Sequence, residues 1–570
     1  MEINTEKKLK AWLDREDLDK ALKDELIELA EARANQLGQA EEELSDRFYR
    51  ELSFGTGGLR GKLGAGTNRM NIYTVGKTTQ GLINYILANK LGTSIAIGYD
   101  SRINSDVFAA YTSEIARANG LDAFIYDTLM PAPALSFAVR HHNCAMGVMI
   151  TASHNPCEYN GYKVYNGRGC QVTDKEANAI LEEIEKLDIF KDVKSLTAET
   201  QKPGILKTMS EETKSAYYEA VMGESLGIDC HDLSVVYTPL NGAGLAPVTE
   251  ILKRAGVGQV TLVPEQTGCD GNFPTCPYPN PEKKDALELG LALSRSVKPD
   301  LLLATDPDCD RVGIAVRHHD DYQLLSGNEV GVLLTDFICR ARSAEDTVKA
   351  MPKDPYMVRT IVTTKMADAI CREFGVKVIT TLTGFKYIGE IIGMHEDKGR
   401  EEDYIFGFEE SYGYLSGTYV RDKDAVNAIL LICQMTALYK ESGKTLIDRM
   451  EDLYNEYGYS RNELLDFQFP GERGMEEMAA IMASFRKDQT PEYADKKVLK
   501  IIDFLKGGEL PPADVVEFSL EDGCGFTVRP SGTEPKLKIY LFGNGKTEKD
   551  VEEYLEKVGR ELTGRIKSME

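Results

Sequence analysis

The sequence predicts an α/β protein of several domains: three similar mixed-sheet α/β domains in series, followed by a smaller α+β domain. The chain has 570 residues, and at roughly 150 residues per domain this length corresponds to three to four domains. Short apolar runs alternate with helical stretches in three separate sets, which is typical of strands and helices in parallel or mixed sheets. The C-terminal part of the chain lacks this alternation and ends the series.

The N-terminal segment is predicted to be helical. Residues 8–52 are rich in Ala, Leu, Glu and Lys at helical spacing, so they indicate one or two amphipathic helices that pack on the first domain. The first α/β set follows, with apolar strands at 94–99, 121–126 and 145–150 and a helix at 105–119.

Two further sets have the same order of strand, helix, strand and strand. They comprise residues 233–237, 247–255, 259–263 and 300–304 in the second set, and 356–362, 365–374, 376–380 and 404–408 in the third. Two late strands at 525–528 and 537–542 and a closing helix at 549–565 indicate the α+β domain. The predicted boundaries are therefore 1–50 for the helical leader and 51–205, 206–325, 326–450 and 451–570 for the four domains.

Composition excludes several classes of protein. The chain carries 67 basic and 91 acidic residues, a formal charge of -24, which opposes broad electrostatic attraction to nucleic acid or to an anionic membrane. The 11 cysteines are scattered without a CxxC pair, which is typical of reduced core residues and not of disulfides or a zinc site. We find no apolar run long enough to cross a membrane and no secretory signal, so the expected location is the cytoplasm.

A polar loop follows the apolar strand AMGVMI and reads TASHNP, from Thr151 to Pro156. Ligands of open α/β sheets bind beyond the carboxyl ends of strands, so Ser153 lies where chemistry usually takes place. The alternative, which composition alone favours, is a polar turn that contains Ser and Asn and ends at Pro.

Three aspartates follow the apolar run DLLLA, at Asp306, Asp308 and Asp310. Carboxylates at this spacing point to one side of an extended segment and repel one another unless a hard divalent cation neutralises them. An EF-hand is excluded, because Arg311 and Arg317 stand where its loop needs Gly and Glu, so Mg²⁺ is the better prediction. A solvated acidic turn is the alternative.

Two later loops also carry groups that suit a phosphorylated ligand. GFEESYGY at 407–414 combines carboxylates, a hydroxyl and aromatic rings, which suits a polyol such as a sugar. RPSGTEPK at 529–536 combines two cations, two hydroxyls and a Gly, which suits a phosphate group. The first loop taken alone is a weak signal, and a plain surface turn is the alternative for the second.

These four loops, in this order and together with FGTGGLRG at 54–61, resemble the α-D-phosphohexomutase family, which includes phosphoglucomutase and phosphomannomutase. The acidic helical leader and the segments GFEESYGY and RDKDA are most similar to the phosphoglucomutase-2/phosphopentomutase branch. The resemblance implies four domains around a central cleft, with one loop from each domain. Cys309 departs from the pattern, because many relatives have Gly there.

The resemblance also implies roles for individual residues. Ser153 would be phosphorylated and would bind Mg²⁺ together with Asp306, Asp308 and Asp310. Arg60, His154 and Lys163 would lie beside the transferring group, with Lys163 the preferred general acid/base and His154 the second choice. The residues expected to bind the sugar phosphate are Arg311, Thr383, Gly384, Lys386, Glu409, Ser411 and Lys423, and those expected to hold its distal phosphate are Arg529, Ser531, Gly532 and Thr533.

The implied activity is interconversion of sugar 1-phosphate and 6-phosphate, most readily of glucose, through a phosphoserine and a bisphosphate. Glucose 1,6-bisphosphate would be the activator and intermediate, and the expected partner is a small phosphosugar, with no nucleic acid and no membrane. Mannose or pentose phosphate specificity stays open, as does the oligomeric state. Two alternatives are a haloacid-dehalogenase-type phosphotransferase, because DCDRV at 308–312 matches its DxDxV motif, and a non-catalytic sugar-phosphate binder.

Overall fold

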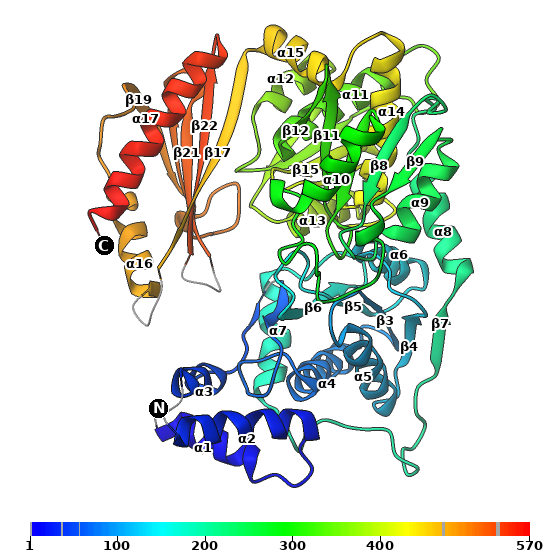
Figure 1. Cartoon of the computed structure of the whole chain (residues 1–570), viewed down its shortest axis with the longest axis vertical. Coiled ribbons are helices and arrows are strands. Elements are labelled where there is room, and N and C mark those ends of the chain that lie inside the picture. The colour runs from blue at the N-terminus through cyan, green and yellow to red at the C-terminus, as the bar shows by residue number, and fades with distance from the viewer. Residues whose placement is uncertain (1–2, 36–37, 56, 470–473, 532–535, 570) are drawn as a thin grey trace.

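The computed structural model describes residues 3–35, 38–55, 57–469, 474–531 and 536–569, which are organised around four β-sheets (Figure 1). The sheets contain seven, five, four and six strands in chain order, and we call the domains that they define domains 1 to 4. Domains 1 to 3 are α/β domains with mixed sheets, and the sheet of domain 4 is antiparallel. The predicted fold class is therefore confirmed, while the exact residue boundaries stay predictions.

The N-terminal leader forms three helices where the sequence predicts one or two. They are α1 (Ile3–Leu13), α2 (Lys20–Ala34) and α3 (Ala40–Phe48). Trp12 is buried among aromatic rings, with Phe48 of α3 at 5.8 Å and Phe190 of domain 1 at 5.3 Å between ring centroids. Apolar contacts thus fix the leader to domain 1. Helical periodicity in the sequence did not reveal the loops that divide the leader into three helices.

Domain 1 has the strand order β1-β2-β6-β5-β3-β4-β7. Its strands are β1 (Phe54–Gly55), β2 (Gly58–Lys62), β3 (Ser94–Tyr99), β4 (Asp122–Tyr126), β5 (Met146–Ile150), β6 (Tyr159–Asn166) and β7 (Leu206–Met209), and its helices are α4 (Ile72–Asn89), α5 (Ser105–Ala118), α6 (Ala132–His141) and α7 (Asp174–Glu185). The central strands β3, β4 and β5 coincide with the three predicted apolar runs, and β3 and β5 are buried on both faces. Strand β6 runs antiparallel to β5 and brings the chain back from the loop that contains Ser153.

Domains 2 and 3 confirm the predicted strand positions to within one or two residues. Domain 2 contains α8 (Glu211–Met222), β8 (Ser234–Thr238), α9 (Leu245–Arg254), β9 (Gln259–Leu262), α10 (Lys284–Val297), β10 (Leu301–Thr305), β11 (Val312–His318) and β12 (Asp321–Leu325). Domain 3 contains α11 (Gly327–Ser343), β13 (Tyr356–Thr360), α12 (Met366–Glu373), β14 (Lys377–Thr381), α13 (Phe385–Glu396), β15 (Tyr404–Glu409), β16 (Gly413–Leu415), α14 (Ala425–Glu441) and α15 (Leu446–Tyr457). In both sheets the polar loops of interest follow a buried strand.

Domain 4 is richer in strands than the sequence predicts. It contains β17 (Tyr459–Gln468), α16 (Gly474–Arg486), β18 (Glu492–Tyr493), β19 (Lys496–Asp503), β20 (Val516–Leu520), β21 (Gly525–Pro530), β22 (Lys536–Gly545) and α17 (Glu548–Lys567). The two predicted strands are β21 and β22, whose apolar residues are buried. Strands β17 and β19 contain no fully buried residue, and charged side chains interrupt their apolar ones, so they lack the apolar run that identified the others.

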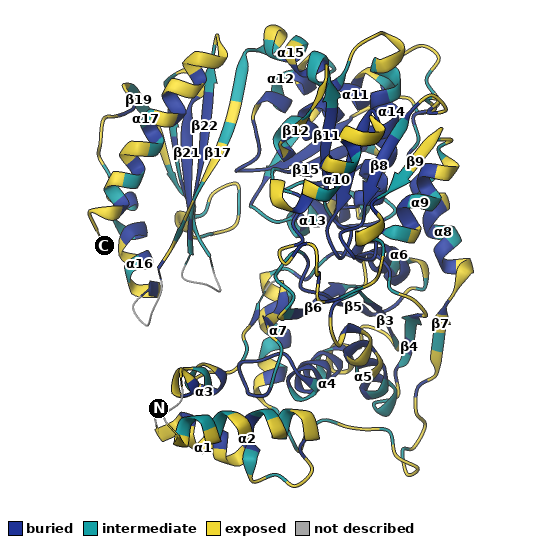
Figure 2. Cartoon of the chain, viewed as in Figure 1, coloured by how far each residue is buried: buried dark blue, intermediate teal, exposed yellow. Residues whose placement is uncertain are grey.

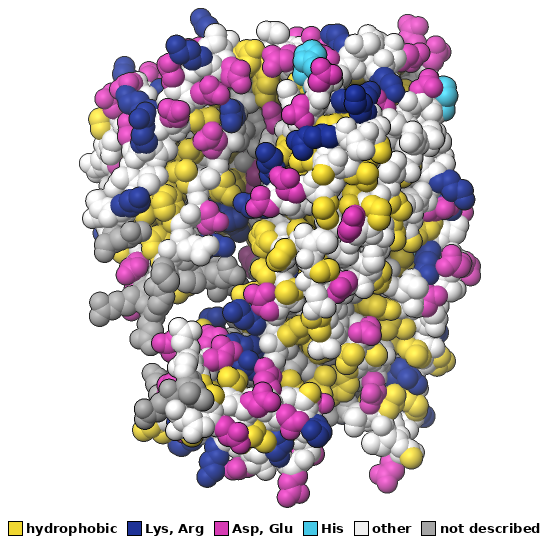
Figure 3. Space-filling view, viewed as in Figure 1, with side chains coloured by type: hydrophobic (Ala, Val, Ile, Leu, Met, Phe, Trp, Pro, Cys, Tyr) yellow, Lys and Arg dark blue, Asp and Glu magenta, His cyan; other side chains and the backbone are white. Residues whose placement is uncertain are grey.

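One continuous core joins domains 1, 2 and 3, whereas domain 4 has a core of its own. Figure 2 shows the buried strands as separate dark bands in domain 4 and in the other domains. A smaller apolar cluster that includes Val362 of domain 3 and Tyr540 of domain 4 connects domain 4 to domain 3. The surface is hollowed where domain 4 faces domain 1, and basic side chains lie at the edge of this hollow (Figure 3). Among the described residues, no helix is both long and apolar enough to span a membrane.

Candidate active site

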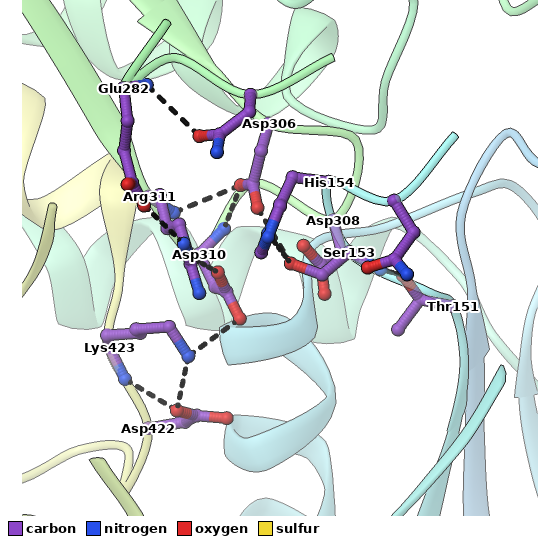
Figure 4. Close-up of polar contacts among 12 residues, drawn as sticks. Thr151, Ser153, His154, Glu282, Asp306, Asp308, Asp310, Arg311, Asp422 and Lys423 are labelled. Atoms are coloured by element: carbon purple, nitrogen blue, oxygen red, sulfur yellow. Dashed lines mark hydrogen bonds and ion pairs between the residues drawn. The ribbon is translucent and has the colours of Figure 1, made fainter. Parts of the chain in front are cut away.

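Ser153 lies in the loop between β5 and β6 and is almost completely buried. Its Oγ donates a hydrogen bond to Oδ2 of Asp306 in domain 2 at 2.9 Å (Figure 4). Its backbone N–H donates to Oγ1 of Thr151 at 2.8 Å. The structure thus brings together the serine loop and the aspartate loop, which the sequence singled out separately.

The aspartate cluster, Asp306, Asp308 and Asp310, follows β10 of domain 2 and is buried. One carboxylate oxygen from each residue lies within 4.8 Å of the others. Oδ1 of Asp308 and Oδ1 of Asp310 are buried and accept no hydrogen bond among the described residues. Buried oxygen atoms without a partner are costly unless something else binds them, so the donor set fits a hard divalent cation.

Cys309 permits the turn that brings the three carboxylates together. Its backbone has φ = +50°, in the left-handed region that favours Gly, and its N–H donates to the carbonyl oxygen of Asp306 at 2.9 Å. The cysteine side chain is completely buried. The departure from Gly at this position therefore leaves the turn intact.

Two lysines from other domains contact the aspartate cluster. Nζ of Lys163, on β6 of domain 1, donates to Oδ2 of Asp308 at 2.7 Å and to Oδ2 of Asp310 at 3.1 Å. Nζ of Lys423, in domain 3, lies 2.9 Å from the same oxygen of Asp310. Three domains thus meet at this one group of charges.

The electrostatics of the cluster are uneven. Burial, and then the charges of Asp308 and Asp310, raise the pKa of Asp306 well above its usual value. Burial acts to raise the pKa of Asp310, but the charges of Lys163 and Lys423 outweigh it and hold that pKa well below its usual range. In return Asp308 and Asp310 raise the pKa of Lys163 although burial acts to lower it.

The two other residues predicted to lie beside the transferring group are His154, in the serine loop, and Arg60, on β2. Nδ1 of His154 is 3.3 Å from Oγ of Ser153. Burial, and then the charges of Arg311 and Arg60, lower the pKa of His154 well below its usual value, so its imidazole is neutral at neutral pH. Arg60 is exposed and donates to Oδ1 of Asn155 at 3.1 Å.

Arg311 is held in place by Glu282, a residue that sequence reasoning missed. Nη1 of Arg311 donates to Oε1 of Glu282 at 2.6 Å, and its backbone N–H donates to Oδ1 of Asp306 at 3.1 Å. Figure 4 shows Glu282 beside Arg311 at the edge of the aspartate cluster. Glu282 precedes α10 and lies far from every motif, so its sequence context gives no signal.

The predicted sugar-binding residues other than Arg311 and Lys423 lie in two loops of domain 3. Glu409 is buried at the end of β15 and Ser411 is half-buried, and the loop is tied to domain 2 by the N–H of Val312, which donates to the carbonyl of Tyr412 at 3.2 Å. Lys423 returns from the next loop to the aspartate cluster. The sugar loop and the metal loop are therefore neighbours.

The second loop of domain 3 contains Thr383, Gly384 and Lys386. Oγ1 of Thr383 is buried and has no hydrogen-bond partner among the described residues, and Gly384 has φ = +123°, which suits only glycine. Nζ of Lys386 donates to Oδ1 of Asp174 of domain 1 at 3.2 Å. Asp174 was not predicted.

Domain 4 contributes Arg529 and Ser531, both half-buried, at the end of β21. Arg529 lies near the sugar loops of domain 3. Burial lowers the pKa of Lys386, and the positive charge of Arg529 lowers it further. Burial raises the pKa of Glu410 to about 7, and the charge of Arg529 acts against this rise. Gly532 and Thr533, predicted for the same role, lie outside the described residues.

Comparison with known proteins covers nearly the whole chain. Sequence models of phosphoglucomutase/phosphomannomutase match in chain order: α/β/α domain I at residues 51–189, domain II at 215–319, domain III at 326–457 and the C-terminal domain at 467–560. The DPDCD loop is part of the second matched domain, so the dehalogenase-type alternative is not retained.

Relatives and solved structures agree with these matches. A phosphoglucomutase from Staphylococcus saprophyticus is 36% identical over 518 residues, which cover 88% of this chain and 92% of the relative. A phosphoglucomutase/phosphomannomutase family protein from Burkholderia thailandensis has a TM-score of 0.66 at 17% identity, covering 90% of this chain and 97% of the other.

An N-acetylphosphoglucosamine mutase from Aspergillus fumigatus, solved in complex with GlcNAc-6P and magnesium, has a TM-score of 0.51 at 14% identity and covers 94% of this chain and 98% of its own. At these identities the two structures show the shared fold alone. The order of the four matched domains and the similarity to the staphylococcal enzyme decide the assignment. The chain belongs to the phosphoglucomutase/phosphomannomutase family and is a phosphosugar mutase.

Proposed function

We propose that the protein interconverts glucose 1-phosphate and glucose 6-phosphate, with Ser153 as the phosphorylated residue and glucose 1,6-bisphosphate as the intermediate and activator. The observation that carries the proposal is the 2.9 Å hydrogen bond from Oγ of Ser153 to Oδ2 of Asp306. It places the one hydroxyl that would carry the phosphoryl group against a buried cluster of carboxylates that fits a cation.

The cation that this proposal assigns to the cluster is Mg²⁺, held by Asp306, Asp308, Asp310 and the phosphate on Ser153. Two buried carboxylate oxygens of the cluster accept no hydrogen bond among the described residues, and oxygen donors alone are what Mg²⁺ prefers. When bound, the ion supplies positive charge to the oxygens of the transferring phosphoryl group. The magnesium in the Aspergillus mutase supports this choice of metal.

The transfer itself exchanges one phosphorus–oxygen bond for another. The bond from phosphorus to Oγ of Ser153 breaks while a bond from phosphorus to a sugar hydroxyl oxygen forms; the hydroxyl gives up its proton to a base, and Oγ takes up a proton. The bisphosphate then turns around and returns its other phosphate to Ser153 by the reverse exchange. Reaction of this kind depends on charge neutralisation and in-line positioning.

Lys163 is the group that we assign to the proton transfers, with His154 as the second choice. His154 lies 3.3 Å from Oγ of Ser153, and Lys163 lies beside the aspartate cluster, 2.7 Å from Oδ2 of Asp308. Burial acts to lower the pKa of Lys163, but Asp308 and Asp310 raise it, so Lys163 is protonated and would first act as the acid that gives a proton to Oγ. Arg60 of β2, which donates a hydrogen bond to Asn155 of the serine loop, would add positive charge on the exposed side of the site.

Sugar recognition is assigned to the loops of domain 3 and phosphate recognition to domain 4. Glu409 and Ser411 would bind hydroxyl groups next to Lys423 and Arg311, and Thr383 offers a buried hydroxyl without a partner among the described residues. The charges of Arg529 and Lys386 act on each other across the two domains, so they would share the distal phosphate with Ser531. Gly384, Gly532 and Thr533 stay predictions for these loops.

The substrate is tested by comparing three sugar 1-phosphates. We expect kcat/KM for glucose 1-phosphate to exceed that for mannose 1-phosphate and ribose 1-phosphate by about tenfold or more, since a site that hydrogen-bonds a hydroxyl discriminates against a sugar that presents it differently. Initial rates are measured with Mg²⁺ and the matching bisphosphate. Preference for ribose 1-phosphate would move the specificity to pentoses, and binding of all three without turnover would indicate a non-catalytic binder.

Replacing Arg529 with alanine tests the role of domain 4. We expect KM for glucose 1-phosphate to rise about tenfold or more, as for the loss of a hydrogen bond to a charged group, and kcat to fall as well, because binding at the distal end positions the reacting end. Release of glucose 1,6-bisphosphate during turnover should increase, because one of its two anchors is lost.

The matched control is Arg461→Ala, which removes an exposed arginine of the same domain that pairs with Glu552 at 3.2 Å. This control should leave KM and bisphosphate release unchanged. If the Arg529 variant behaves like the Arg461 variant in both measurements, RPSGTEPK is a surface turn and not a phosphate site.

A further inference from the structure

The backbone of Ser153 adopts a conformation that a serine rarely holds. Its φ is +52°, in the left-handed region, where the Cβ of a non-glycine residue is crowded. Such a conformation persists only where the surroundings determine it. The direction of the Ser153 Oγ towards Asp306 therefore depends on whatever holds this backbone.

The carbonyl side of Ser153 is held by Arg102, in the loop after β3. Nη2 of Arg102 donates to the carbonyl oxygen of Ser153 at 2.6 Å and also to that of Asn155. Nη1 donates to the carbonyl oxygens of Pro156 and Tyr159, each at 2.9 Å. Arg102, which is 2% exposed, thus binds three carbonyls of the serine loop and that of Tyr159 at the start of β6.

The amide side of Ser153 is held by Thr151, whose Oγ1 accepts its N–H at 2.8 Å (Figure 4). Asp100 supports Arg102 on the carbonyl side. Its Oδ1 accepts the backbone N–H of Arg102 at 3.0 Å and the hydroxyl of Ser105 at 2.8 Å, and its Oδ2 lies 3.5 Å from Nε of Arg102. Burial raises the pKa of Asp100, while the charge of Arg102 and the hydroxyl of Thr151 act in the opposite direction.

Domain 2 closes over this arrangement. The guanidinium of Arg102 lies 5.1 Å from the centre of the Phe273 ring, within the range of a cation–π contact. A Cβ at Gly271 would stand 2.5 Å from the backbone nitrogen of Ile103, so only glycine allows this close approach. The same domain supplies Asp306, so the packing that covers Arg102 also sets where the acceptor of the Ser153 hydroxyl lies.

We propose that Asp100, Thr151 and Arg102 are positioning residues that hold Ser153 in its left-handed conformation and so direct its Oγ at the aspartate cluster. Neither the motif analysis nor the family comparison assigns them this role. The inference rests on the proposed function, because it concerns the serine that is proposed to carry the phosphate. The three residues would act through Ser153.

The hydroxyl of Thr151 allows the sharpest test. Thr151→Val keeps the shape of the side chain and removes the acceptor of the Ser153 N–H, and Thr151→Ser keeps the acceptor. We expect kcat for glucose 1-phosphate to fall about 100-fold in the valine variant, the effect of a small misplacement of reacting groups, with KM changed by less than about threefold. The serine variant should recover most of the lost kcat.

Arg102→Lys provides the second test, because lysine keeps the charge but cannot bind four carbonyls at once. Its matched control is Arg69→Lys, which changes an arginine of the same domain that is also 2% exposed and pairs with Asp46 at 2.7 Å. Both variants are expected to melt at a lower temperature. Only the Arg102 variant should lose kcat by about 100-fold.

Single-turnover transfer from the phosphorylated enzyme to glucose 1-phosphate is measured for all variants, beside phosphate mapping on Ser153 of the unaltered protein. The proposal is overturned if the valine variant transfers phosphate at the unaltered rate, if serine restores nothing, or if Arg69→Lys slows transfer as much as Arg102→Lys. Turnover by unaltered protein that carries no phosphate on Ser153 refutes the proposed function instead. The two failures are therefore distinguishable.

Discussion

Ser153→Ala is expected to lower turnover of glucose 1-phosphate by about 10⁴-fold or more, the range found when a nucleophile of a covalent mechanism is removed. The variant lacks the oxygen that would carry the phosphoryl group. It should nevertheless fold, because Ser153 makes few contacts that alanine would lose beyond the bond from its Oγ to Asp306. Turnover is measured in a coupled assay and folding by thermal unfolding.

The position of the phosphate is measured on the unaltered protein by phosphopeptide mapping. A phosphoserine survives hydroxylamine, whereas a phosphate on the carboxylate of Asp308 is cleaved by it. The matched control is Ser113→Ala, which removes a buried serine whose hydroxyl donates to the carbonyl of Ala110 in its own helix at 2.7 Å. Hydroxylamine-labile phosphate on the DPDCD peptide, or full turnover by the Ser153 variant, would contradict the assignment.

Asp308→Asn is expected to weaken Mg²⁺ binding by about tenfold or more and to lower kcat by about 10²- to 10³-fold. The substitution removes one negative charge from the aspartate cluster and puts an amide nitrogen in place of one carboxylate oxygen of Asp308. Of these two oxygens, Oδ1 accepts no hydrogen bond among the described residues, and Oδ2 accepts one from Lys163. Since phosphoryl transfer depends on neutralisation of charge, loss of metal affinity and loss of rate should go together. Calorimetric titration with Mg²⁺ measures the first and steady-state kinetics the second.

The control for this variant is Asp336→Asn, which changes another fully buried aspartate, paired with Arg449 at 2.9 Å. That variant should lose stability and keep its affinity for Mg²⁺, because breaking a buried ion pair acts on folding. Full activity of chelator-treated protein without added metal would show that the cluster is not a metal site.

The sequence by itself located several of the strands whose residues are buried on both faces, although it missed β6 and β11, which are mostly buried as well. Strands β3, β5, β10 and β15 are near-continuous apolar runs, so their positions and the polar loops after them could be predicted. The same reasoning failed for β17 and β19, whose side chains are largely exposed, and it underestimated the number of helices in the leader. Local pattern is a reliable signal only where burial is strong enough to shape it.

The resemblance to known mutases supplied candidate residues, and only the tertiary structure decided how they meet. Ser153 and Asp306 are 153 residues apart, and Lys163 and Asp308 are 145 apart, yet each pair is within hydrogen-bond distance. No local pattern encodes such contacts, because they depend on how domains 1, 2 and 3 pack around one continuous core.

The roles of the residues that support the site could not be predicted from the sequence either. Arg102 and Glu282 act through neighbours that lie far along the chain, Arg102 on the serine loop and Glu282 on Arg311. Asp100 and Arg102 follow β3, which pairs with β5, so the order of strands in the sheet brings them to the serine loop. Local composition specifies which segments become strands. Which charged side chains lie in the site is decided only when the domains pack together, because a buried charge needs a partner and here the partner comes from another domain.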